Sequence, residues 1–167
     1  MSLDFGDPGW RDKRLAPKPT RYVVVEDNGR DVLMALSRDS ASARWTPLEK
    51  DLREGMELSW QWKVTRGLSG DRDERAKIGD DYPARVLVAF DPDPFSKSTR
   101  ALCYVWAKGE PKGSIYESPY SSNVATIVVR SGESGVGVWV TESRNVVDDY
   151  RLAFGENPSK IYALAVM

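Results

Sequence analysis

Two adjacent carboxylates, at Asp80 and Asp81, form the first pattern in the chain that could do chemistry. They directly precede Tyr82-Pro83 and an apolar run, so both would lie in a rigid turn at the end of a strand. An oxygen-rich turn of this kind can bind calcium, but calcium takes about six to eight oxygen ligands, which other loops would have to complete. The pattern predicts either a calcium site at this pair or a solvated turn in which the aspartates cap the backbone.

Charged residues of both signs also gather around a predicted helix that begins after Asn145. Asp148 and Asp149 fall in its first turn, where acidic side chains stabilise the helix dipole, and Asn145 has the side chain of an N-cap. Alternatively, Arg144, Asp149 and Arg85 form a polar network that links the helix to the sheet. Such a network would serve as an ion-pair scaffold or as a ligand clamp, and the sequence does not separate the two.

Aromatic side chains are the third group that could form a functional site, because sugar-binding sandwiches stack flat rings on pyranose faces. The chain has six Trp and seven Tyr. Four tryptophans fall in predicted strands and are expected in the core, namely Trp60, Trp62, Trp106 and Trp139. Better exposed candidates fall in predicted loops: Trp10, Trp45, Tyr116 and Tyr120. The last two belong to the polar segment 113–123, which could line a binding face.

Missing residue types exclude several enzyme classes. The chain contains no histidine, which removes Ser-His-Asp and Cys-His catalysis and the common zinc sites. Its one cysteine, Cys103, lies in an apolar run and is expected to be an inert core thiol. The glycine-rich segment 132–137 joins two predicted strands, so it is a hairpin turn and not a phosphate loop.

A glycosidase needs two carboxylates roughly 5 to 10 Å apart. The sequence offers too many for a choice: Asp80, Asp81, Glu117, Glu142 and Asp149.

Length and charge restrict the class of protein further. At 167 residues the chain has the size of a single domain, which we expect to span residues 1–167. The 24 basic and 25 acidic residues nearly cancel, so nucleic acid is not an expected partner. No run approaches the roughly 20 apolar residues of a membrane span, and the first residues lack a signal-peptide pattern. We therefore expect a soluble polypeptide.

Period-2 alternation dominates the pattern of elements. In Leu58–Thr65, apolar and polar residues alternate as in a half-buried strand, and Asn28-Gly29 predicts a tight hairpin over residues 20–37. Further strands are expected at 85–90, 101–107, 124–130 and 136–141, one short helix at 145–154, and a polar loop at 66–81. The predicted fold is mostly β, an antiparallel two-sheet sandwich of jelly-roll type.

Several of these fragments occur together in a known family. They are Leu58–Trp62, Gly79–Val86, Tyr104–Trp106, Gly137–Trp139 and Arg144–Gly155. Their set and order resemble a bacterial family of domains of unknown function, number 3047 in that series, from about Trp10 to Met167. The resemblance implies a β-sandwich and an exported, periplasmic location, and it implies no activity. Family members continue beyond the segment like 161–167 into an Asp-x-Asp-Asn-Thr motif and a last strand, so we expect a C-terminal truncation or a different natural end.

The leading functional hypothesis is a non-catalytic module that binds a carbohydrate or similar polar ligand, assisted by calcium. Ligand contacts are expected from Arg85, Tyr116, Tyr120, Arg144 and Asp149, and metal ligands from Asp80 and Asp81. The first alternative is an enzyme that acts on glycans through a carboxylate pair. The second is a structural or protein-interaction domain, which buried aromatics and a free edge strand would favour.

Overall fold

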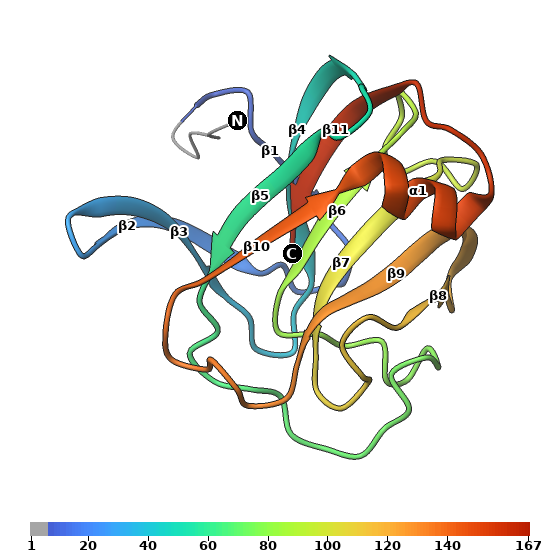
Figure 1. Cartoon of the computed structure of the whole chain (residues 1–167). Helices are drawn as coiled ribbons and strands as arrows, with labels where there is room; N and C mark the ends of the chain where they lie inside the picture. Colours follow the sequence, from blue (N-terminus) through green and yellow to red (C-terminus); the bar gives the residue numbers. More distant parts are fainter. Residues whose placement is uncertain (1–6) are drawn as a thin grey trace.

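A computed structural model describes residues 7–167, which form a two-layer sandwich, a separate β-hairpin and one helix, with eleven strands in all (Figure 1). The elements are β1 (Arg11–Arg14), β2 (Arg21–Asp27), β3 (Arg30–Leu36), β4 (Ser42–Asp51), β5 (Glu57–Trp62), β6 (Arg85–Ala89), β7 (Ala101–Ala107), β8 (Ile115–Ser118), β9 (Ser121–Ser131), β10 (Val140–Asn145), α1 (Val146–Phe154) and β11 (Lys160–Val166). The predicted class, a mostly β sandwich with one short helix, is confirmed.

The large layer is a seven-stranded sheet in the order β1-β4-β11-β6-β7-β9-β8. Strand β11 is interior, with β4 on one side and β6 on the other. One pair departs from the antiparallel expectation, because β7 and β9 are parallel. After β7 the chain runs to β8 at the edge of the sheet, and β9 then lies between β7 and β8. Strand β9 pairs antiparallel with β8, and this direction makes it parallel to β7.

The second layer contains β5 and β10, which pair antiparallel with Trp60 opposite Glu142. The alternation predicted for β5 is confirmed: Leu58, Trp60 and Trp62 are at least partly buried in the core, whereas Ser59 and Gln61 are exposed. Beneath them lie Leu102, Tyr104 and Trp106 of β7 and the inner residues of β9. The core is therefore an aromatic layer between the two sheets, with Trp60 at 5.2 Å from Tyr104 and Trp62 at 5.9 Å from Trp106 between ring centroids.

The strand predicted at 136–141 is wrong in its first half, since the structure begins β10 at Val140. Gly135 and Gly137 have φ of +90° and +86°, a left-handed conformation that suits glycine and interrupts a strand. Residues 132–137 form a turn that leads into β10, but it is not the predicted hairpin turn, because β9 and β10 lie in different sheets. Strands β1, β4, β8 and β11 were not predicted, because none shows a clean alternation.

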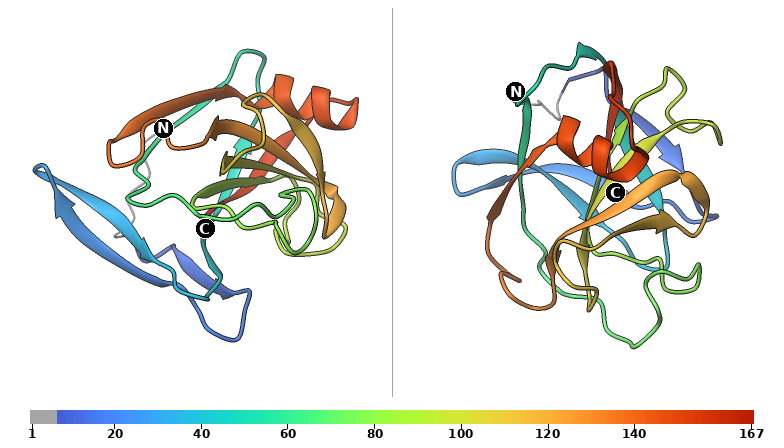
Figure 2. Two further views of the ribbon diagram at one scale, coloured as in Figure 1. Left: turned by 90° about the horizontal axis from the view of Figure 1, so that it is seen from below. Right: turned by 45° about the vertical axis from the view of Figure 1, so that its right-hand side comes forward.

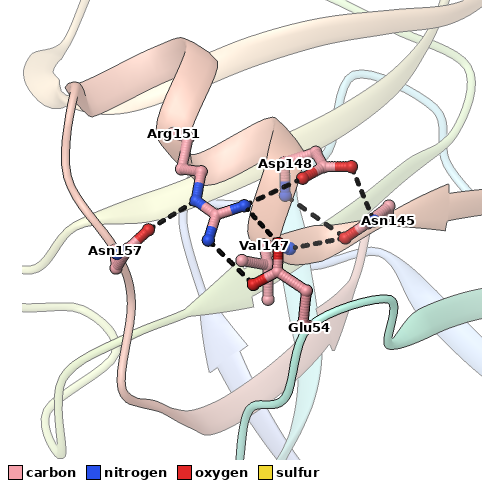
Figure 3. A network of polar contacts seen from close by, with 6 residues as sticks. All are labelled: Glu54, Asn145, Val147, Asp148, Arg151 and Asn157. Carbon is pink, nitrogen blue, oxygen red and sulfur yellow. Dashed lines mark hydrogen bonds and ion pairs between the residues drawn. The ribbon is translucent and has the colours of Figure 1, made fainter.

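The predicted helix and its caps are confirmed in α1. The Asn145 side chain accepts hydrogen bonds from the backbone N–H groups of Val147 and Asp148, and Gly155 ends the helix with φ of +73°. Figure 3 shows how Arg151 anchors the exposed side of α1: its guanidinium contacts both carboxylate oxygens of Glu54 at 2.9 Å, and it donates to Asn157. The helix is thereby held to the β4–β5 turn.

The β2–β3 hairpin is separate from both layers. Its turn residues Asn28 and Gly29 have φ of +56° and +77°, as the Asn-Gly pair predicts. Figure 1 and both views of Figure 2 show it as an arm beside the sandwich. Within residues 7–167, no helix is long and apolar enough to cross a membrane.

Candidate functional site

A polar hollow of about 340 Å³ lies between the irregular segment 66–82 and the turn that follows β7. Its charged lining residues are Asp71, Arg72, Asp73, Glu74, Lys108 and Glu110. The sequence predicts a solvated loop here, and the backbone of the segment is irregular, with no helix or strand. The structure adds that three sets of side-chain contacts hold the loop against the sheet and so define the hollow.

Glu74 makes the first set of contacts. Its side chain is buried, and its carboxylate accepts hydrogen bonds from three consecutive backbone N–H groups, those of Lys108 at 2.7 Å, Gly109 at 2.8 Å and Glu110 at 2.9 Å. Successive N–H groups of this kind form a concave anion site, a nest, and here the anion belongs to the chain itself. The buried charge is stabilised by hydrogen bonds, which fixes the floor of the hollow.

Two tyrosines make the second set. The hydroxyls of Tyr82 and Tyr116 lie 2.6 Å apart, and the Tyr82 hydroxyl also donates to the carbonyl of Glu74 at 3.0 Å. Burial raises the pKa of Tyr116 to about 12 and raises that of Tyr82 further. Arg75 lies over the Tyr116 ring at 4.7 Å and binds Glu110 at 2.8 Å, so one face of this ring is covered.

Arg85 makes the third set, with Asp80. The guanidinium lies 3.1 Å from the Asp80 carboxylate and donates to the Asp80 carbonyl at 2.7 Å, while it stacks on Tyr82 at 4.7 Å. Asp81 is exposed. In the described part of the chain, no group of three or more His, Cys, Asp or Glu side chains is placed to hold a metal ion. The geometry thus gives no support to a calcium site at Asp80 and Asp81.

Cys103 lies below Arg85 on the same face of the sheet and is buried, as predicted. Burial raises the pKa of its thiol to about 11, so it stays protonated at neutral pH.

Tyr120 lies at the far end of the 66–82 segment. Its ring is 64% exposed, and its hydroxyl donates to the Lys77 carbonyl at 3.2 Å. Arg85, Tyr116 and Tyr120 thus each contact a different residue of segment 66–82, and none of them lines the hollow.

Arg144 and Asp149 lie elsewhere, between the two layers. Asp149 is 2% exposed and accepts hydrogen bonds from Arg144 at 2.9 Å and from the Tyr104 hydroxyl at 2.9 Å. This network links α1, β10 and the large sheet, as predicted. The expectation that Arg85 belongs to it is wrong, because Arg85 points to the opposite face of the large sheet and pairs with Asp80.

Glu142 is the second carboxylate buried between the layers. It accepts from Arg130 at 2.7 Å and lies 3.4 Å from the Trp62 indole nitrogen. The sequence names Glu142 only as one of many carboxylates, since nothing local indicates its partner. Both interlayer carboxylates are held by an arginine, so neither is placed as a free general acid or base.

The tryptophans are less exposed than the loop assignments predict. Among the described residues no tryptophan is exposed: Trp10, Trp62 and Trp106 are buried, and the other three are partly buried. Trp45 lies in β4 and contacts Phe95 edge to face at 5.5 Å. None of the tryptophans therefore offers a well-exposed ring on which a sugar could stack.

Sequence reasoning missed the residues that line the hollow, above all Arg72, Glu74 and Lys108. Position 74 shows no apolar periodicity that would indicate burial, and its partners lie more than thirty residues away. Only the long-range fold reveals them.

The architecture defines a two-layer β-sandwich domain with a polar hollow beside one edge of its large sheet. Comparison with family models gives its membership: residues 8–167 match the family "Protein of unknown function (DUF3047)". The chain belongs to this family, which confirms the resemblance drawn from its fragments. A search of curated proteins gave no match.

Proposed function

We propose that this domain is a non-catalytic module that binds a small polar ligand in the hollow between segment 66–82 and the turn after β7. The observation that carries the proposal is the hollow itself, whose charged walls rest on fixed backbone contacts. A site built in this way is ordered before ligand arrives, which reduces the entropy cost of binding.

Free charged groups at the rim suggest the class of ligand. The Lys108 ammonium and the Asp71 carboxylate line the hollow without an ion-pair partner among the described residues, and Arg72 makes one long contact, at 3.5 Å to the Ile78 carbonyl. Donors and acceptors side by side suit a carbohydrate or a similar polar ligand. Hydrogen bonds and charge, and not stacking, would supply the affinity, because Arg75 covers the Tyr116 ring.

The interlayer carboxylates support a binding role over a catalytic one. Catalysis by a carboxylate pair needs groups that reach the substrate, one of them free to exchange a proton. Glu142 and Asp149 are buried and hydrogen-bonded to arginines. This is the reason for preferring the non-catalytic module to a glycan-acting enzyme.

The experiment is a thermal-shift and calorimetric screen of the protein against neutral and acidic sugars, with and without calcium. A ligand at about a hundred times its Kd should raise Tm by roughly 5 to 10 °C. Arg72→Ala and Lys108→Ala should each weaken binding by about ten-fold or more, because each removes a charged hydrogen bond. Arg53→Ala, an exposed residue on the β4–β5 turn, is the matched control. Equal affinity of the wild type and both variants for a ligand, or no binding of any ligand, would refute this assignment.

A further inference from the structure

The β5–β10 pair of the second layer and the β2–β3 hairpin beside it are two separate two-stranded sheets. Strand β5 pairs only with β10, and β2 pairs only with β3. Among the described residues, the backbone of β5 has no hydrogen bonds outside the β10 pairing, and the hairpin has none beyond its own ladder. Each sheet therefore presents a row of unpaired backbone N–H and C=O groups along an outer edge.

The hairpin carries apolar side chains that nothing in the described chain covers. Val24 is 41% exposed, Met34 37% and Leu36 48%. An isolated two-stranded hairpin is marginally stable in water, and a third strand or a packed face is needed to stabilise it. The exposed apolar residues and the open edge therefore indicate a missing partner for this element.

Side chains at the hairpin tip hold it beside β5. Arg30 donates to Gln61 at 2.5 Å, and Asp27 binds Lys63 at 2.5 Å and the Trp139 indole nitrogen at 2.7 Å. Figure 1 places β5 on the hairpin side of β10, and Figure 2 shows the hairpin apart from this pair. The two open edges are thus kept on the same side of the molecule.

An apolar hollow of about 70 Å³ lies next to the same strand. Leu48, Leu58, Ile161 and Leu164 line it. Lys50 and Glu57 also line it, and Lys50 has no ion-pair partner among the described residues.

We propose that β5 and the β2–β3 hairpin accept between them an extended segment of another polypeptide, which adds a strand and joins the two sheets into one layer. The open edges supply main-chain hydrogen bonds, and alternate side chains of the segment point inward to fill the hollow. The segment alternates apolar and polar residues, with an acidic residue where it faces Lys50. A folded edge of a second copy fits less well, because the tip contacts close one end of the space.

The probe is the synthetic peptide acetyl-Glu-Val-Thr-Val-Thr-Val-Thr-Glu-amide, whose last Glu shares a face with the valines. Binding should saturate below ~1 mM. Amide hydrogen exchange should slow in Glu57–Trp62 and in the hairpin, and stay unchanged in β8, an edge strand on the other layer. The same peptide with N-methylated valines keeps its side chains and loses edge hydrogen bonds, so it should not bind.

Charge reversal tests the orientation. Lys50→Glu should weaken binding of the Glu peptide by about two- to five-fold and strengthen binding of its Lys-ended counterpart by a similar factor. Failure of both peptides to bind, equal binding of the methylated peptide, or protection outside β5 and the hairpin would each overturn the proposal. So would a concentration-dependent dimer with β5 protected in the absence of peptide, which would assign the edge to a second copy.

Discussion

Three consecutive backbone N–H groups, those of Lys108, Gly109 and Glu110, converge on the carboxylate of Glu74. This side chain is one of the three contacts that position the irregular segment 66–82, which has no strand ladder of its own. Local patterns cannot predict such a residue, because a glutamate between charged neighbours has the composition of a solvated loop. Cys103 shows the opposite case, since a lone thiol within an apolar run is predictable as core.

Removing the Glu74 carboxylate should destabilise the domain more than its place in a loop implies. We expect Glu74→Ala to lower the free energy of unfolding by about 2 to 4 kcal/mol, because three backbone N–H groups lose a buried charged acceptor. Urea unfolding followed by tryptophan fluorescence measures the change. Asp73→Ala, at an exposed neighbour, should cost far less, and equal losses for the two variants would contradict the role of Glu74.

Elements with a strong local signal are the ones that sequence predicts well. The Asn28-Gly29 hairpin, the alternating β5 and the capped helix α1 agree with prediction because their conformations depend on neighbouring residues. Strand β7, buried along its whole length, was found from its apolar run. Strand β4 was not found: its burial varies along ten residues, because it crosses from the packed part of the sheet to an open end.

The cap of α1 offers a test at the scale of one element. Asn145→Ala removes two backbone hydrogen bonds at the start of the helix and should cost about 1 kcal/mol in the free energy of unfolding. Asn145→Asp should retain most of the stability, because its carboxylate also accepts from these N–H groups. Chemical denaturation of the three proteins side by side measures both effects, and a loss in the Asp variant as large as in the Ala variant would argue against capping.

Across the whole molecule, polar groups join parts that the backbone ladders do not. Tyr104 joins the two layers through Asp149, Tyr22 ties the hairpin base to Ser42, and Tyr82 with Tyr116 fixes segment 66–82. Sequence could not predict these pairs, since every one spans distant positions. The hollow, the open layer edge and the interlayer ion pairs are for the same reason properties of the fold alone.

These tyrosines should make the stability of the folded domain fall at alkaline pH. Burial raises the pKa of Tyr22 and Tyr116 to about 12 and shifts those of Tyr82 and Tyr104 upward as well. A raised folded-state pKa means that the neutral phenol is favoured on folding. The resulting stability is complete below about pH 10, the unfolded value, and declines as pH rises through about 12.

Urea titrations at pH 8, 10 and 11.5 should therefore show a falling midpoint above pH 10. In Tyr116→Phe the midpoint should fall less over the same pH range, since the substitution removes one of the titrating phenols. A midpoint that stays level to pH 11.5 would show that the phenols are as acidic in the folded chain as in the unfolded chain.

The interior position of β11 has a kinetic consequence. Residues 160–166 form the strand that joins β4 to β6, so β1 and β4 cannot pair with the rest of the large sheet until more than a hundred further residues have been synthesised. Pairings of such long sequence separation slow folding and leave apolar strands exposed in the meantime. During synthesis, we therefore expect the β4 edge to stay without its β11 partner until the strand near residue 160 has been made.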